Sequence, residues 1–153
     1  MKINCIPSLC LQLQVLIILA SFSTNKVVES DIRCLRSIKE SLEDPLHIFS
    51  TWNFNNNTEG FICRFTGVEC WQHDKNKVLN IRLPKMDLRG QFPMGIRNCD
   101  SLTGLDLSSN YLSGPIPSNI AQLLGFIFVL KLSNNSSQVQ SHLALPIVRI
   151  SMF

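Results

Sequence analysis

The sequence predicts an α/β solenoid, in which short strands stack and each coil of the chain covers the apolar face of its neighbour. Three observations support this prediction. An apolar pattern recurs 24 residues on, each full repeat has a glycine and a proline at fixed places, and an amphipathic segment with paired cysteines precedes the repeats. Hydrophobic residues make up 45% of the chain and charged residues 16%, which excludes a disordered chain and a coiled coil.

The repeats occupy residues 78–135 as two full units and one partial unit. Alternating leucines put one face of a short strand inward, and the Asn110 amide can both donate and accept in the tight coil that follows. Stacked copies would form a ladder of such bonds. Gly114 permits a close turn, and Pro117, which has no backbone N–H, occupies a position where no hydrogen-bond donor is needed. The aligned positions are Ile81, Leu83, Met86, Leu88, Gly90, Phe92, Pro93, Ile96 and Cys99 with Leu105, Leu107, Asn110, Leu112, Gly114, Ile116, Pro117, Ile120 and Leu123.

The third unit starts at Leu130 and Leu132, reaches Asn135 and then loses the frame. Residues 136–153 are predicted to be a divergent tail, either lying across the last coil as a makeshift cap or forming an extra strand. The abrupt loss of the frame favours a chain cut short over a drifting terminal repeat. Because stacked coils need about three repeats, we expect marginal stability.

Residues 1–30 have the features of a secretory signal peptide, with Lys2 ahead of an apolar stretch from Leu9 to Phe22 and small residues after it. The stretch is shorter than the roughly 20 residues of a spanning helix. We expect cleavage between 23 and 30, with an uncleaved anchor as the alternative, and entry of the protein into the secretory pathway.

Residues 31–77 are predicted to cap the first coil. Ile32, Leu35, Ile38 and Leu42 recur at helical spacing, and Pro45 marks the end of that helix. A solenoid needs such a cap because its first coil would otherwise expose its core.

A secreted protein passes through an oxidising compartment, so close pairs of cysteines are candidates for disulfides before they are candidates for metal sites. Cys63 and Cys70 enclose a short loop, and closing it would stabilise the fold by roughly 2–3 kcal/mol. No histidine has zinc-ligand spacing with them. Cys34, in the cap helix, and Cys99, in the slot of Leu123, are expected to be buried free thiols.

Three asparagines fit the N-x-S/T sequon and are candidate glycosylation sites: Asn56, Asn134 and Asn135. Such triplets also arise by chance in loops rich in Asn and Ser.

The frame LTGLDLSSNYLSGPIPSNIAQL resembles the plant-type leucine-rich repeat, L-x-x-L-x-L-x-x-N-x-L-S-G-x-I-P. The segment from Asp31 to about Lys77 resembles the N-terminal cap of plant leucine-rich repeat receptors, whose signature is C-x-W-x-G-V-x-C; here Phe65 replaces the Trp. The resemblance implies plant-type repeats behind a helical cap closed by a Cys63–Cys70 disulfide.

A narrower resemblance, over roughly residues 31–135, is to the BIR-type receptor-like kinases; it is carried by CLRSIKESLEDPL, STWNFNNNTEGFICRFTGVECW and LRGQFPMGIRNCDSLTGLDLSSN. These plant plasma-membrane proteins have a short ectodomain, a spanning helix and a kinase-like domain that is often inactive. The family implies an ectodomain that binds the ectodomain of a shared leucine-rich repeat co-receptor kinase and restrains immune and growth signalling. This chain would be an ectodomain fragment, without the spanning helix and the kinase-like domain. The resemblance implies that it is extracellular, or associated with the plasma membrane through the missing part of the parent receptor.

The candidate partner-binding residues are outward positions of the strand face, which is the usual recognition surface of solenoids. A solvated face without a partner is the alternative. The residues are Asn80, Arg82, Lys85, Thr103, Asp106, Ser108 and Lys131.

Other function classes have little support in the sequence. There is no triad histidine, phosphate loop or metal-binding helix, so no enzymatic activity, cofactor or metal is expected. The formal charge of +3 is small and scattered, which argues against nucleic acid. The remaining alternatives are a small secreted leucine-rich repeat protein, such as an enzyme inhibitor, and a truncated product without stable function.

Overall fold

A computed structural model describes residues 12, 14–15, 29–56, 58–117, 120, 125–136, 138–139 and 149–151. Most of the predicted signal peptide, and Leu123 of the second repeat, lie outside the described residues. In the parts that are described, no helix has the length and apolar character needed to cross a membrane.

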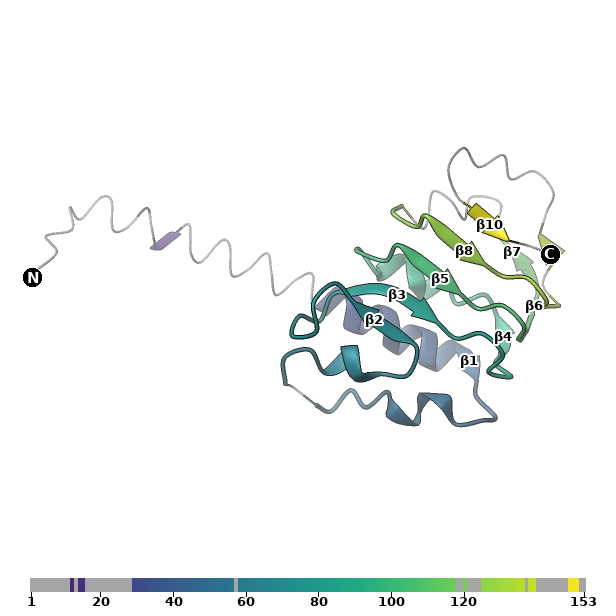
Figure 1. Cartoon of the computed structure of the whole chain (residues 1–153), viewed down its shortest axis with the longest axis horizontal. Coiled ribbons are helices and arrows are strands. Elements are labelled where there is room, and N and C mark those ends of the chain that lie inside the picture. Colours follow the sequence, from purple (N-terminus) through teal and green to yellow (C-terminus); the bar gives the residue numbers. More distant parts are fainter. Residues whose placement is uncertain are drawn as a thin grey trace, which may run out of the picture.

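The cap begins with a helix that covers residues 29–41 and packs along the first coils (Figure 1). It buries Leu35 and Ile38 completely, as their helical spacing predicts. The rest of the cap consists of short elements: β1 (Leu42–Glu43), η1 (Ile48–Thr51), η2 (Phe61–Arg64) and β2 (Val68–Cys70).

An aromatic cluster fills the interior of the cap. Trp52 is fully buried and stacks on Phe65 with ring centroids 5.6 Å apart, while Phe49 tilts against Trp52 at 4.6 Å. The Trp52 indole donates to the carbonyl of Thr66 at 3.0 Å, so its polar end is satisfied. Phe65, the aromatic that replaces the Trp of the cap signature, is therefore a core residue of the cap.

The main sheet has five strands in the order β10-β8-β5-β3-β2 (Figure 1). Strands β3, β5, β8 and β10 are parallel, and β2 of the cap pairs antiparallel with β3. Their bounds are β3 (Val78–Arg82), β5 (Gly104–Asp106), β8 (Val129–Lys131) and β10 (Arg149–Ser151).

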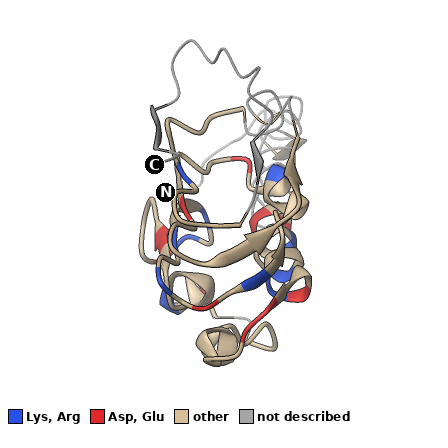
Figure 2. Cartoon of the chain, turned by 90° about the vertical axis from the view of Figure 1, so that its right-hand side faces the viewer, with Lys and Arg blue, Asp and Glu red and all other residues tan. Residues whose placement is uncertain are grey.

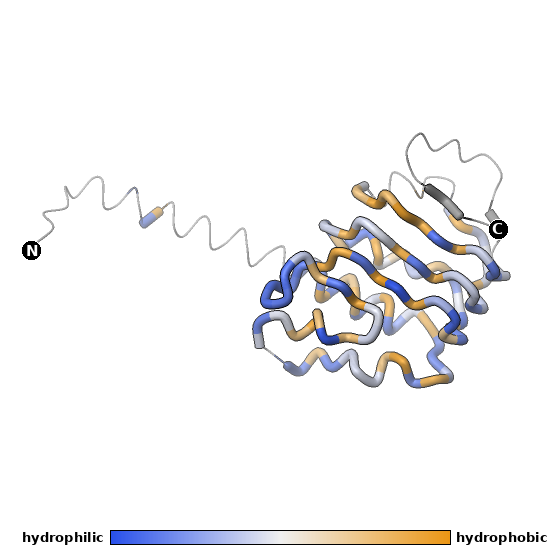
Figure 3. Tube along the Cα trace, viewed as in Figure 1, coloured by the Kyte–Doolittle hydropathy of each residue, from blue (hydrophilic) through white to orange (hydrophobic). Residues whose placement is uncertain are grey.

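The repeat pattern sets the register of this sheet. Ile81 lies beside Leu105 and Leu105 beside Leu130, and all three are almost fully buried. Residues on either side of them face outward, so polar and apolar residues alternate along the strands (Figure 3). The aligned leucines therefore form one continuous core between coils.

Each coil returns through shorter elements on the other side of the core. Strands β1, β4 (Arg89–Gln91) and β6 (Tyr111–Ser113) form a second sheet, and η3 (Met94–Asn98) follows β4. Strand β7 (Pro115–Ile116) pairs with β9 (Gln138–Val139). Strands β9 and β10 both come from the tail, whose other residues beyond Ser136 lie outside the described ones.

The asparagine ladder forms as predicted. The Asn110 side chain accepts from the backbone N–H groups of Met86 and Leu88 at 3.0 and 3.1 Å. Its Nδ2 donates to the carbonyls of Leu83 and Leu107 at 2.7 and 3.0 Å. One buried amide therefore satisfies backbone groups of two successive coils, which explains how the first coil tolerates Met86 in the ladder position.

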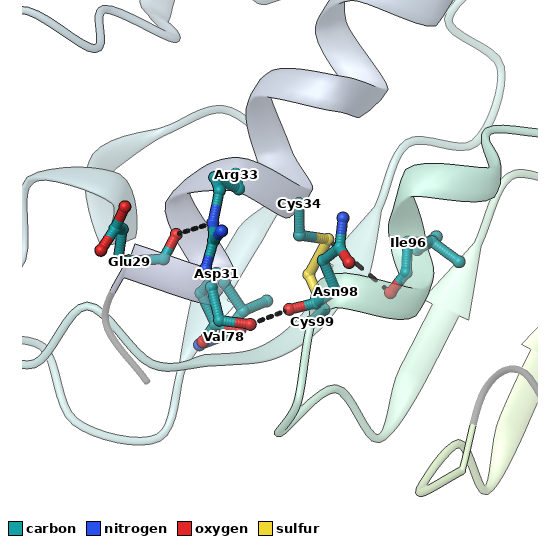
Figure 4. The surroundings of a disulfide bond; sticks show 9 residues. Glu29, Asp31, Arg33, Cys34, Val78, Ile96, Asn98 and Cys99 are labelled. Atoms are coloured by element: carbon teal, nitrogen blue, oxygen red, sulfur yellow. Dashed lines mark hydrogen bonds between the residues drawn. A yellow bond between two sulfur atoms is a disulfide. The ribbon is translucent and has the colours of Figure 1, made fainter. Parts of the chain in front are cut away.

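The Cys63–Cys70 disulfide is present in the cap. The expectation of free thiols at Cys34 and Cys99 is wrong, because these two residues also form a disulfide, with Cα atoms 5.3 Å apart (Figure 4). The Cys99 slot in this first coil faces the cap helix and not another repeat, so its side chain meets Cys34. Ser30, one turn earlier on the helix, donates to the carbonyl of Asn98 at the same junction.

Asp31 is a second link at this junction. It is fully buried and accepts from the Val78 N–H at 2.8 Å through Oδ2. Burial raises the pKa of Asp31 from 3.8 to about 6, with a smaller raising effect from Asp100 and an opposing one from the Val78 hydrogen bond. The cap helix therefore holds the first strand through a carboxyl group that titrates in mildly acidic solution (Figure 4).

Replacing Cys34 and Cys99 together by alanine should lower the free energy of unfolding by about 2–4 kcal/mol, because this disulfide closes a long loop in the unfolded chain. The cysteines are 65 residues apart, against 7 for Cys63 and Cys70. Urea unfolding of the double alanine variant of each pair measures the two effects, with the smaller loss expected for Cys63 and Cys70. An unchanged urea midpoint without Cys34 and Cys99 would contradict the structural role of their bond.

The pKa of Asp31 should make stability depend on pH. Because the folded protein binds this proton more tightly than the unfolded chain, the stability that it contributes is complete below about pH 4 and is lost as pH rises to about 6. The loss is on the order of 3 kcal/mol from this shift. Urea unfolding from pH 4 to 7 should show the decline in the wild type and in Asp74→Asn, whose carboxylate is exposed, but a smaller decline in Asp31→Asn. Equal slopes in all three proteins would exclude Asp31 as the source.

Candidate protein-binding surface

Two columns of outward residues run across the main sheet. One column consists of Asn80, Gly104 and Val129, and the other of Arg82, Asp106 and Lys131. The columns arise because the buried central residues of β3, β5 and β8 are in register, and side chains alternate between the two faces of a strand. We call these six residues and Glu69 of β2 the strand face.

Charge alternates along the strand face from the cap to the last repeat. Arg82 pairs with Glu69 at 3.2 Å, and Lys131 pairs with Asp106 at 3.5 Å. Asn80 also donates to Glu69, at 2.8 Å. Except for Asp106, the paired side chains are 43–61% exposed, so the pairs contribute little to stability and mainly orient the charges. Acidic and basic residues are interspersed and do not gather by sign (Figure 2).

A hollow of about 280 Å³ lies within the strand face. Gly104 is one of the residues that line it, and the Asn80 side chain lies over this glycine. A Cβ atom at Gly104 would approach the Asn80 side-chain oxygen to 2.5 Å, so even alanine would displace that amide. Val129 adds an apolar wall that is 38% exposed. The hollow thus combines an apolar wall with charged groups along one side, as protein recognition sites commonly do.

The structure brings four of the predicted binding residues together on the strand face: Asn80, Arg82, Asp106 and Lys131. Lys85 is exposed but follows the end of β3, in a left-handed backbone conformation with φ 57°.

Thr103 and Ser108 have internal partners. The Thr103 hydroxyl donates to the Leu79 carbonyl at 3.1 Å, and that of Ser108 donates to Asp106 at 2.6 Å. Asp106 also accepts from the Ser108 N–H and pairs with Lys131, so its carboxylate positions its neighbours.

Glu69 and Gly104 were not among the predicted residues. The sequence signal for Glu69 was a charged residue next to the apolar Val68, which the structure buries while Glu69 stays half-buried. Its partner Arg82 could not be inferred, because β2 and β3 are antiparallel with a register irregularity at Glu69 and Cys70. Gly67 supports this pairing: it adopts φ 79°, and a Cβ there would lie 2.4 Å from the Arg82 carbonyl.

The three sequon asparagines lie in different surroundings. Asn56 is exposed, and its side-chain oxygen accepts from the Thr58 N–H at 3.0 Å. Asn134 is exposed just after β8, whereas Asn135 is half-buried and belongs to the ladder. Among the described residues, no group of three or more His, Cys, Asp or Glu side chains is placed to hold a metal ion.

Residues 28–71 match the family model of the leucine rich repeat N-terminal domain. The capped parallel sheet and this match are those of a leucine-rich repeat protein with its N-terminal cap, and solved leucine-rich repeat ectodomains share the fold. More narrowly, the chain is homologous to inactive leucine-rich repeat receptor-like kinases, which confirms the BIR-type resemblance. It is 50% identical over 99 residues to the inactive receptor-like serine/threonine-protein kinase BIR2 of Arabidopsis thaliana, which covers 65% of this chain and 16% of that protein.

Two solved structures from Arabidopsis thaliana support the same assignment. The BIR2 ectodomain superposes with a TM-score of 0.68 at 50% identity, covering 70% of this chain and 56% of that one. A chain of the BIR3–SERK2 complex superposes with a TM-score of 0.63 at 39% identity, covering 71% and 57%. The chain therefore spans about a sixth of the curated relative and rather more than half of each solved chain.

Proposed function

We propose that this chain is part of the ectodomain of a BIR-type receptor-like pseudokinase, and that it binds the ectodomain of a leucine-rich repeat co-receptor kinase. In the longer protein, the repeats would continue as a solenoid beyond the coils described above. The kinase-like domain of the relatives lies outside the matched region, so no enzymatic activity is proposed for this chain.

The observation that carries this proposal is the strand face, which is open, charged in alternating signs and hollowed at Gly104. The basic side chains of its ion pairs are exposed, 61% for Arg82 and 49% for Lys131, so a partner can reach both of them with acidic groups of its own. BIR3, a BIR-type protein, has been crystallised in complex with SERK2, and this complex supports the choice of partner.

The consequence we propose is regulatory. An ectodomain that occupies a shared co-receptor keeps that co-receptor from other receptors, by mass action and without any chemical step. The result would be restraint of immune or growth signalling at the plasma membrane.

Truncating Arg82 and Lys131 together to alanine should weaken binding to a SERK-type co-receptor ectodomain at least tenfold, because both basic groups of the strand face are removed. The matched control is Arg33→Ala with Arg97→Ala, two exposed arginines on the cap helix and on η3 that do not belong to the strand face. Affinities would be measured by biolayer interferometry on secreted full chains, with thermal melting as the test of folding.

A control variant that binds within twofold of the wild type, beside the weakened face variant, supports the strand face as the binding site. Equal affinity of the face variant and the wild type would contradict the strand face as the binding site. Absence of binding by the wild-type chain itself would instead contradict co-receptor binding.

A further inference from the structure

Two overlapping sequons follow β8. The run Asn134-Asn135-Ser136-Ser137 makes Asn134 an acceptor through Ser136 and Asn135 an acceptor through Ser137. The two asparagines are equivalent as sequons, but their hydrogen bonds and exposure in the fold differ.

Asn135 is a structural residue of the third coil. Its Oδ1 accepts from the Leu112 N–H at 3.0 Å, and its Nδ2 donates to the carbonyls of Leu107 and Leu132 at 2.8 and 3.0 Å. These contacts repeat those of Asn110 one coil earlier. Both N–H bonds of the amide are therefore needed to satisfy backbone carbonyls of two coils.

Asn134 has no such role. It is exposed, its backbone is left-handed with φ 56°, and its Nδ2 makes a long contact of 3.3 Å with the Ser109 hydroxyl. Lys85 and Ser109 hold the same left-handed conformation in the two preceding coils, with φ 57° and 56°. The repeat geometry thus places each of these residues at the rim of the sheet, where a side chain can be extended into solvent.

N-glycosylation has different consequences at the two sites. The secretory-pathway transferase uses a polyprenyl-diphosphate oligosaccharide: Nδ2 forms a bond to the anomeric carbon, the carbon–oxygen bond to the diphosphate breaks, and Nδ2 gives up one of its two protons to the enzyme. A glycosylated asparagine therefore keeps one N–H. At Asn134 this costs one exposed contact, whereas at Asn135 it removes a ladder donor and places a sugar between two coils.

We propose that the folded protein carries an N-linked glycan on Asn134 and none on Asn135, and that a glycan on Asn135 prevents the third coil from closing. This inference does not depend on the proposed function, because it concerns the ladder and not the strand face.

The test is glycopeptide mapping of the full chain expressed in a eukaryotic secretory host. Peptide-N-glycosidase in heavy-oxygen water converts each glycosylated Asn to a labelled Asp, and tandem mass spectrometry separates positions 134 and 135. The soluble, protease-resistant fraction should be labelled at 134 only. A label at 135 in that fraction, or an unlabelled 134, would overturn the proposal.

Serine variants separate the two sequons without changing either asparagine. Ser137→Ala removes only the Asn135 sequon and should leave the glycan and the yield of folded protein unchanged. Ser136→Ala removes only the Asn134 sequon, and any chain then labelled at 135 should be found in the protease-sensitive fraction. The double variant removes both sequons and should recover folded protein without this glycan. A Ser136→Ala chain that is folded and labelled at 135 would refute the exclusion.

Discussion

The fold depends on the way a tight coil satisfies its own backbone. Where the chain turns away from each strand, carbonyl and N–H groups point into the interior and need hydrogen-bond partners inside the protein. The amide of Asn110 bonds to five of them, in two coils at once, and Asn135 makes similar bonds one coil later. Leaving such groups unpaired costs about 1–3 kcal/mol each. Because each ladder amide must reach backbone groups of two coils, the ladder fixes the spacing between neighbouring coils and thereby the packing of their leucines.

The cap extends the same constraint to the first coil. No earlier repeat covers that coil, so the cap helix does, through the Cys34–Cys99 disulfide and the Asp31–Val78 hydrogen bond. Strand β2 then adds Glu69 to the edge of the sheet and pairs it with Arg82. The strand face is therefore shared between cap and repeats, and the cap is part of the candidate recognition surface as well as a cover for the core.

Much of this arrangement could be predicted from the sequence, because it rests on local or periodic signals. The 24-residue spacing placed Ile81 beside Leu105, and the Asn in the fixed frame predicted the ladder. The short loop with Gly67 predicted the Cys63–Cys70 bond. The outward columns followed from alternation, although Thr103 and Ser108 proved to have internal partners. The assignment of the strand face to a partner remains a proposal.

The sequence by itself determined the repeat, the inward leucines, the ladder and the position of the cap, since each depends on residues a few positions or one period apart. Only the tertiary structure decided the pairing of Cys34 with Cys99, the burial of Asp31, the Glu69–Arg82 pair and the difference between Asn134 and Asn135. These depend on the angle and register at which the cap and the coils pack. A period specifies which residues recur, but it does not specify which residues of the cap the first coil meets.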